Sequence, residues 1–263
     1  MAGHSLVPPD HHYGALMDAA WPALERHDTG EWVHRAAAGV TQRANSVWPR
    51  DCAREPKEAL RAALQWYRQR RLPLIFQVTE TPANSALNHL LDAEGFTRQS
   101  ETLIMCRAGT DAPSPSPSAT AAAVEVTDQP GTGWLDLWWS VDGRGGTAGM
   151  ETARAILAGC PSLYALVRDD DGVPAAVGRL ALVAGTGGIY CMATSPTHRR
   201  RGYASAVLEA LLTAGSANGA DSFWLLVTAA NQAARQLYSG AGFQEAGRYL
   251  YRQQRPARAL TGC

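Results

Sequence analysis

Three consecutive arginines lead into a glycine in the segment Arg199-Arg200-Arg201-Gly202-Tyr203-Ala204. The residues before it, Ile189 to Ala193, read as a strand, and the residues after it begin an apolar helical pattern. A turn from a strand into a helix leaves the first N–H groups of the helix unpaired, at the positive end of its dipole. Gly202 lets an anion approach the backbone without meeting a Cβ atom, and the arginines add positive charge. The segment therefore predicts a diphosphate site.

A second motif, Asn231-x-x-Ala234-x-x-Leu237-Tyr238-x-x-x-Gly242-Phe243, follows one intervening helix and strand. It predicts a helix with Tyr238 near its end. A phenol can donate a proton at neutral pH, so Tyr238 is a candidate acid for a leaving thiolate. The alternative is an amphipathic residue that covers the core. Alone, the arginine-glycine segment would equally fit an ordinary basic helix start.

The composition favours two folded domains without a nucleic-acid or membrane partner. Of the 263 residues, 46% are hydrophobic, which is enough for each half to bury a core. The formal net charge is +0, so electrostatics gives no reason to expect binding to nucleic acid or to a membrane surface. Five widely spaced cysteines without a CxxC pair fit a reduced, cytoplasmic compartment. We expect a soluble protein, because no apolar run reaches the ~18 residues of a membrane span and no secretory signal is visible.

Alternating proline and serine in residues 109–122 predict an exposed linker. It would separate an N-terminal domain, residues 1–108, from a second domain, residues 123–263. The second domain reads as an α/β (α+β) sandwich with a mixed sheet. Its expected strands are 124–126, 163–168, 175–183, 188–193, 223–227 and 248–252, its expected helices are 134–141, 150–158, 204–217 and 231–239, and a hairpin turn is expected at 185–187.

The first domain contains a weaker copy of the second motif. Asn84 through Phe96 repeats the Asn, the Leu at the seventh position and the final Gly-Phe of Asn231 through Phe243. This spacing indicates an internal duplication, for which a chance match is the alternative. The expected strands of the first domain are 31–35, 44–47, 74–78 and 101–106, and its expected helix is 57–70.

The first domain lacks the chemistry of the second. Leu91 stands where the second motif has Tyr238, and no segment of residues 1–108 resembles the arginine-glycine turn. The polar segment Val40–Val47 is a candidate to shape a substrate site, with a plain strand and turn as the alternative. His4, His11 and His12 lie in an N-terminus that we expect to be loosely ordered rather than metal-binding.

The paired motifs of the second domain resemble those of the GNAT superfamily of acyl-CoA-dependent N-acetyltransferases. Arg199-x-x-Gly202-x-Ala204 matches the acetyl-CoA pyrophosphate motif of that family, and Asn231 through Phe243 matches its helix-plus-Gly-Phe motif. The resemblance covers about residues 123–254. With the weaker copy, the whole chain is similar to tandem-GNAT proteins of actinobacterial type with a degenerate N-terminal unit. It implies two GNAT-like units, each a mixed, mostly antiparallel sheet flanked by helices.

The resemblance also implies roles for individual residues. Acetyl-CoA is the implied co-substrate, without a metal, and its pantetheine arm would lie along Tyr190–Thr194. A splay from the next strand, Phe223–Val227, would free a backbone N–H to polarise the thioester carbonyl. Tyr238 would be the general acid. The implied acetyl-CoA-binding residues are Met192, Ala193, Thr194, Arg199, Arg200, Arg201, Gly202, Tyr203, Ala204, Ser205 and Asn231.

The general base stays open at this stage. Many members of the family carry a glutamate on the strand before the arginine-glycine turn, but residues 188–193 contain no acid. Asp142, Glu151 and Asp221 are alternatives, directly or through water, and Cys191 fits a buried strand thiol better than a nucleophile. The tryptophans near the implied acceptor site fit either core packing or an aromatic pocket, and they are Trp134, Trp138, Trp139 and Trp224.

The leading expectation is transfer of an acetyl group to a primary amine of a small molecule, such as an amino acid, amino sugar or antibiotic. The amine would attack directly in a ternary complex. A protein or peptide amine is the alternative acceptor, and a non-catalytic acyl-CoA sensor or interaction module is the alternative class. The protein is expected to be a monomer or a homodimer.

Overall fold

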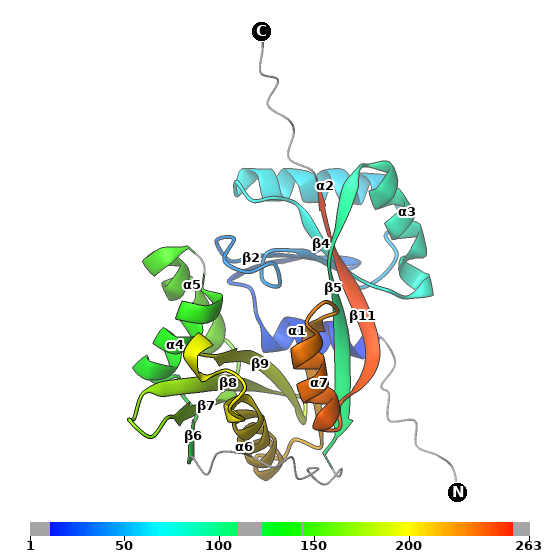
Figure 1. The fold of residues 1–263 in the computed structure, drawn as a ribbon. Coiled ribbons are helices and arrows are strands. Elements are labelled where there is room, and N and C mark those ends of the chain that lie inside the picture. The colour runs from blue at the N-terminus through cyan, green and yellow to red at the C-terminus, as the bar shows by residue number, and fades with distance from the viewer. Residues whose placement is uncertain (1–10, 110–122, 144, 255–263) are drawn as a thin grey trace, which may run out of the picture. The chain divides into compact units, whose positions relative to one another are not determined.

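The computed structural model describes residues 11–109, 123–143 and 145–254, which divide into two compact units (Figure 1). Unit 1 contains Met1–Pro22 and Leu103–Gly247, and unit 2 contains Ala23–Thr102 and Arg248–Cys263. Both units are discontinuous because the strands β5 (Phe96–Ala108) and β11 (Gln244–Gln254) each begin in one unit and end in the other. Apart from Gly109, the expected linker 109–122 lies outside the described residues, and the domain division there stays a prediction.

Unit 1 is a mixed sheet with α4 on one face and α6 on the opposite face (Figure 1). Its strand order is β5-β10-β9-β8-β7-β6, antiparallel from β6 to β9 and parallel between β9 and β10. Its other elements are α1 (His11–Ala20), β6 (Val124–Thr127), α4 (Thr132–Asp142), α5 (Gly146–Ala158), β7 (Ser162–Arg168), β8 (Pro174–Val183), β9 (Thr186–Thr194), η2 (Pro196–His198), α6 (Tyr203–Ala217), β10 (Ser222–Thr228) and α7 (Gln232–Gly240).

Helix α6 buries the apolar stripe that its sequence predicted. Val207, Leu208 and Leu211 are at most 1% exposed and pack in one cluster with Leu180 of β8 and Phe223 of β10. The 3.6-residue period of the stripe is the physical reason, because it places these side chains on one side of the helix. Their packing holds α6 against the sheet.

The hairpin between β8 and β9 turns one residue earlier than expected. Ala184 and Gly185 form the turn with φ of 48° and 74°, which is the pattern of a two-residue type I′ turn. Thr186 already pairs with Val183, so the expected turn at 185–187 is wrong beyond its first residue. Gly187 serves packing instead, because a Cβ atom there would lie 2.7 Å from the ring of Phe223.

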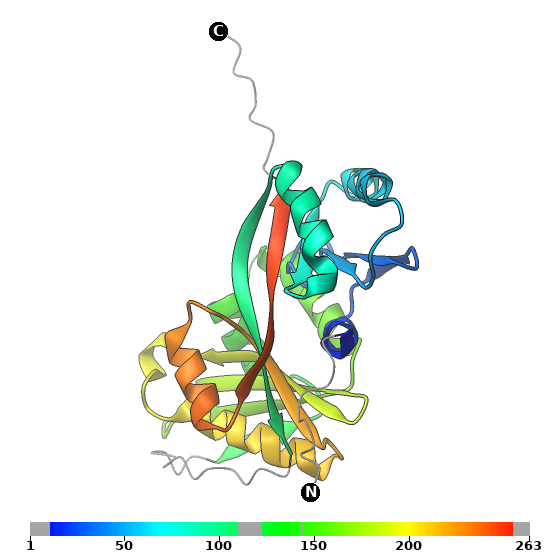
Figure 2. The same cartoon turned by 90° about the vertical axis from the view of Figure 1, so that its right-hand side faces the viewer.

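Unit 2 is a smaller sheet of order β1-β2-β3-β4-β11, with α2 and α3 on the same side (Figure 2). Its elements are β1 (Glu25–Asp28), β2 (Trp32–Ala36), β3 (Val47–Pro49), α2 (Pro56–Gln69), β4 (Ile75–Thr79), η1 (Pro82–Asn84) and α3 (Ser85–Ala93). The expected strand at 44–47 is therefore mostly loop, and strand pairing begins only at Val47. Its core includes Trp32, Tyr67, Phe76, Leu91 and Phe96.

The element order supports the internal duplication. The sequence β1-β2-β3-α2-β4-α3-β5 repeats as β7-β8-β9-α6-β10-α7-β11. The pair β3–β4 is parallel, as is the pair β9–β10. In each unit the last strand of the sheet comes from the other repeat, since β5 lies beside β10 and β11 pairs with β4.

The N-terminal segment packs in unit 1, which corrects the expectation of a loosely ordered N-terminus from His11 onward. Helix α1 contacts β8 and β9. The buried guanidinium of Arg179 donates from Nη1 to the carbonyl oxygen of Ala20 at 3.0 Å. The ring of Trp21 stacks on that of Tyr190 with centroids 5.5 Å apart. His4 lies outside the described residues.

The polar segment Val40–Val47 of unit 2 has an internal hydrogen-bonding role. Asn45 is buried, and its Oδ1 accepts from the backbone N–H groups of Ala37 and Gly39, each at 2.8 Å. Its Nδ2 donates to the carbonyl oxygen of Thr41 at 2.7 Å. Asn45 thus holds the loop between β2 and β3, as the alternative of a plain strand and turn predicted.

Candidate active site

Strands β9 and β10 pair over only part of their length. Their parallel pairing runs from Thr186 opposite Ser222 to Ile189 opposite Leu225. Strand β9 continues to Thr194 and β10 to Thr228, so the end of each strand extends past the last pair. Backbone groups on this edge of β9 are therefore not used by the β9–β10 ladder, as the expected splay requires. The three predicted residues of β9 lie in this stretch: Met192, Ala193 and Thr194.

A bulge deforms β9 within the same stretch. On β8, Val177 lies opposite Ala193 and Arg179 opposite Tyr190, so β9 has one extra residue between the two pairs. Cys191 takes up the insertion with φ of 53°, which is uncommon for a residue other than glycine. Bulges of this kind redirect the backbone and occur next to active sites. The local residue pattern of β9 does not indicate this bulge.

The arginine-glycine turn has the backbone shape of an anion site. Arg200 has φ of 65°, and Gly202 precedes α6 with φ of 86°. The N–H of Ala206 donates to the Gly202 carbonyl at 3.1 Å, which leaves the three preceding N–H groups without a helical acceptor. These N–H groups lie at the positive end of the α6 dipole. They belong to Tyr203, Ala204 and Ser205.

The arginine side chains of this turn are available to a ligand. Arg199, Arg200 and Arg201 are exposed. Within residues 11–109, 123–143 and 145–254, none of them forms a hydrogen bond or ion pair. Because the left-handed φ at Gly202 disfavours any other residue, the glycine is required by the backbone as well as by the approach of a ligand. The turn combines free amides with uncommitted positive charge.

Asn231 and Tyr238 lie at opposite ends of α7. Asn231 Oδ1 accepts from the backbone N–H of Ala234 at 3.1 Å and caps the helix. Tyr238 is 7% exposed, and its ring packs edge-on against Phe243. Burial raises the pKa of Tyr238 to about 12, and the charge of Asp142 adds to this shift. The phenol therefore stays protonated at neutral pH, which a proton donor requires.

Asp142 is the acidic candidate that the structure brings near Tyr238. It is the last residue of α4, it is exposed, and its charge acts on the Tyr238 phenol. Asp221 lies before the other end of β10, where its carboxylate accepts from the Ser222 hydroxyl at 3.1 Å. Glu151 is exposed on α5. Of the three acids, Asp142 is the one whose charge acts on Tyr238, and the general base stays a prediction.

The tryptophans of unit 1 are mainly core residues. Trp134, Trp138 and Trp224 are at most 5% exposed, whereas Trp139 is half-buried. Trp134 Nε1 donates to the carbonyl oxygen of Gly178 at 3.0 Å, which fixes α4 to the sheet. These contacts favour the packing role over a binding pocket.

Two residues near the turn were missed by the sequence reasoning. His198 precedes Arg199, and its Nε2 lies 2.8 Å from Oδ2 of Asp169 in the turn between β7 and β8. His198 is 9% exposed. A histidine directly before three arginines was the only local signal, because its partner is distant in the sequence.

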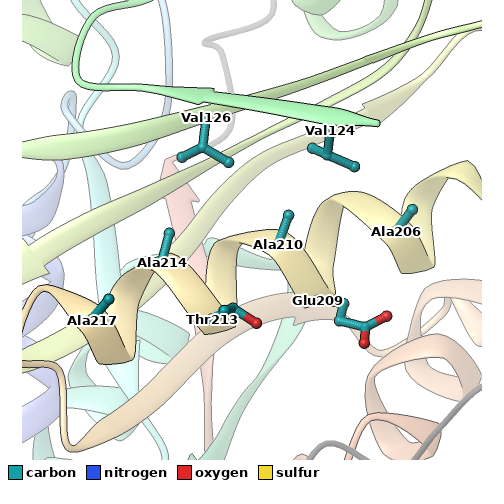
Figure 3. Close-up of a pocket in the computed structure, with 8 residues that line it drawn as sticks. All are labelled: Val124, Val126, Ala206, Glu209, Ala210, Thr213, Ala214 and Ala217. Carbon is teal, nitrogen blue, oxygen red and sulfur yellow. The ribbon is translucent and has the colours of Figure 1, made fainter. Parts of the chain in front are cut away.

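An open apolar groove of about 510 Å³ runs between β6 and α6 (Figure 3). Its lining is Val124, Val126, Ala206, Glu209, Ala210, Thr213, Ala214 and Ala217. None of the predicted site residues lines it. The helices in the described ranges are too short or too polar to cross a membrane. The same ranges contain no group of three His, Cys, Asp or Glu side chains placed to hold a metal ion.

Comparisons with known proteins identify relatives of the chain. Residues 15–252 match the family described as "Probable histone acetyltransferase Rv0428c C-terminal". The uncharacterized N-acetyltransferase YobR of Bacillus subtilis (strain 168) is 26% identical over 242 residues, covering 91% of this chain and 96% of the relative.

Solved structures share the fold. A GCN5-related N-acetyltransferase from Kribbella flavida has a TM-score of 0.70 at 17% identity, covering 94% of this chain and 96% of that one. A tandem GNAT protein from the clavulanic acid biosynthesis pathway has a TM-score of 0.59 at 15% identity, covering 81% of this chain and 76% of that one. The chain belongs to the family of the probable histone acetyltransferase Rv0428c C-terminal region and is an acetyltransferase of the GNAT type.

Proposed function

We propose that this enzyme transfers an acetyl group from acetyl-CoA to a primary amine of a small molecule, by direct attack in a ternary complex. The observation that carries the proposal is the start of α6. There, three N–H groups without helical acceptors, Gly202 at φ of 86° and three uncommitted arginines form one anion site. A diphosphate is the part of acetyl-CoA that fits these groups.

The edge of β9 is suited to the rest of the donor. Its residues beyond Ile189 extend past the β9–β10 pairing, so their backbone can bind the amides of a pantetheine arm. A free N–H at this edge would also stabilise the oxyanion that develops on the thioester carbonyl. In this arrangement Met192, Ala193 and Thr194 bind the arm.

Two side chains supply the proton transfers in this proposal. The amine nitrogen forms a bond to the acetyl carbon, the carbon–sulfur bond breaks, and the departing sulfur takes a proton from Tyr238. The attacking amine loses a proton, and we assign Asp142 as the base that receives it through water, because Asp142 is the acid whose charge acts on Tyr238. The buried phenol, with its pKa raised to about 12, is a donor throughout the neutral range.

A protein lysine is the competing acceptor, and the description of the matched family favours it. That family is described as a probable histone acetyltransferase. Both acceptors present a primary amine, so the donor chemistry is the same and only the acceptor surface differs.

The test is thiol release from acetyl-CoA with a panel of acceptors. The panel contains amino acids, amino sugars, an aminoglycoside and a lysine-rich histone-tail peptide. Release with a small amine supports the proposal, whereas release with the peptide alone assigns the protein acceptor. CoA binding without release on any acceptor would indicate a sensor, and the absence of CoA binding would remove the donor assignment.

A further inference from the structure

We propose that His198 and Asp169 form a positioning pair that holds the Arg199–Gly202 turn in its diphosphate-binding shape. The proposal rests on the proposed function, because that turn is the inferred donor site. Neither residue needs to touch the donor. Their effect would be exerted through the backbone of the turn.

The pair links two segments that are separated in the sequence. His198 Nε2 lies 2.8 Å from Asp169 Oδ2, and His198 Nδ1 lies 3.0 Å from Thr197 Oγ1. The other oxygen of Asp169, Oδ1, accepts from the N–H groups of Asp171 at 3.1 Å and Val173 at 2.7 Å. Asp169 is thereby fixed to the turn between β7 and β8, and His198 is fixed to Asp169.

The hydrogen bonds also define the direction of donation. The bond from His198, together with the N–H bonds from Val173 and Asp171, holds the pKa of Asp169 below its ordinary value. An ionised carboxylate only accepts, so the hydrogen of the pair is carried on His198 Nε2. In the neutral ring Nδ1 then accepts from the Thr197 hydroxyl. Both ring nitrogens are used, which locks the ring orientation.

The ring of His198 joins the two residues that flank the turn. His198 precedes the turn, and its ring packs edge-on against the ring of Tyr203, the residue that follows the turn, with centroids 5.8 Å apart. Arg200, between them, has φ of 65°, and such a conformation persists only where its surroundings enforce it. We infer that the contact between His198 and Tyr203, together with the bond from His198 to Asp169, maintains this conformation of Arg200.

An ordinary core histidine would produce a different result on mutation. Loss of a purely structural residue would weaken the binding of every ligand of unit 1. Loss of a positioning residue would weaken the binding only of ligands that carry the diphosphate. CoA and pantetheine separate these roles, because pantetheine is the fragment of CoA without the diphosphate.

Two substitutions separate packing from hydrogen bonding. His198→Phe keeps an aromatic edge against Tyr203 but loses both ring nitrogens. His198→Gln restores an N–H that can donate to Asp169. Asp169→Asn removes the charge of the partner carboxylate, and Asp170→Asn is its matched control, because it makes the same charge change in the same turn at an exposed side chain, whereas Asp169 is the residue bonded to His198.

The measurements are the Kd for CoA by calorimetry and the Kd for pantetheine by NMR titration, with the Tm of each variant. We expect His198→Phe to raise the CoA Kd about tenfold, equivalent to 1.4 kcal/mol, and to leave the pantetheine Kd unchanged. His198→Gln should recover most of the loss, and Asp170→Asn should match the wild type. If His198→Phe does not fold, Asp169→Asn carries the same expectation.

Three outcomes would overturn the inference. An unchanged CoA Kd in His198→Phe would show that the pair does not position the turn. An equal loss for CoA and pantetheine would assign His198 a structural role only. If the wild type itself failed to bind CoA, the proposed function would fall together with the inference, whereas the first two outcomes leave the proposed function standing.

Discussion

The two repeats begin equivalent helices with opposite chemistry. Helix α6 follows three exposed arginines and Gly202, and its first N–H groups have no helical acceptor. Helix α2 instead follows Glu55, begins with Pro56 and carries Glu58 in its first turn. Proline has no N–H to offer, and carboxylates at a helix start repel an anion. The shared framework therefore supports an anion site in unit 1 and opposes one in unit 2.

The helices that end in Gly-Phe show the same contrast. Gly242 and Gly95 both have positive φ, 86° and 74°, because each ends its helix in the left-handed conformation. The Phe that follows each glycine is buried. Yet α7 carries Tyr238 where α3 carries Leu91, which is fully buried. The duplication has kept the residues that shape the fold, and only one copy has the phenol.

The largest expected effect is at the start of α6. Gly202→Asp should raise the CoA Kd by about 1,000-fold, since a carboxylate ~4 Å from a phosphate is repelled by about 4 kcal/mol at an effective dielectric constant of 20. Gly219→Asp is the matched control, because Gly219 has a similar φ of 84° just beyond the other end of α6, with open space around it. Calorimetric titration with CoA measures both variants. Comparable CoA binding by the two would remove the turn from the donor site.

The next effect tests which unit the N-terminal segment stabilises. Trp21→Ala should lower the free energy of unfolding of unit 1 by about 3–5 kcal/mol, because Trp21 is 2% exposed and stacks on Tyr190 of β9. Hydrogen exchange should show faster exchange in β9 and no change in β4. Trp48→Ala in β3 of unit 2 should show the reverse. Loss of protection in β4 alone after Trp21→Ala would contradict the assignment of this segment to unit 1.

The contrast between Tyr238 and Leu91 is tested by removing the phenol. Tyr238→Phe should lower kcat about 100-fold with little change in the KM for acetyl-CoA, because a positioned acid contributes at this level and the ring packing is retained. Tyr67→Phe in unit 2 is the control, a buried tyrosine whose hydroxyl bonds to the backbone of Arg35. Steady-state thiol release measures both. An unchanged kcat in Tyr238→Phe would leave Tyr238 with a packing role only.

The smallest effect is a pH dependence specific to unit 2. Burial lowers the pKa of His34 from 6.5 to about 4, with smaller contributions from the charges of His27 and Arg70. In the unfolded chain His34 binds a proton below about pH 6.5, whereas in the folded chain it binds one only below about pH 4. Stability is thus present above pH 6.5 and falls toward pH 4, by up to about 1.4 kcal/mol per pH unit.

The measurement is urea unfolding between pH 7 and pH 5, followed by hydrogen exchange in β4. His34→Phe should lose less stability than the wild type over this interval. His89→Phe, at an exposed histidine of α3, is the control and should keep the wild-type slope. Equal slopes in wild type and His34→Phe would show that His34 titrates normally.

Much of unit 1 was predictable from local patterns. The helix from Tyr203 was predicted within one residue at its start, because apolar spacing and the glycine both mark it. The mixed sheet and the GNAT-type fold are confirmed. The bulge at Cys191 was missed, since a register shift depends on the neighbouring strand and not on the residue itself. The link from His198 to Asp169 was missed for the same reason.

The sequence by itself determined the residue types of the candidate site: arginines and a glycine at a helix start, a phenol on the following helix, and neither of these at the equivalent positions of the first repeat. These site features depend on residue type and on spacing over a few residues, and such local patterns determine turns and helix ends. Only the tertiary structure decided that α1 packs in unit 1 and that β5 and β11 each run from one unit into the other. Such pairings depend on which distant surfaces bury each other, and no local period encodes that choice.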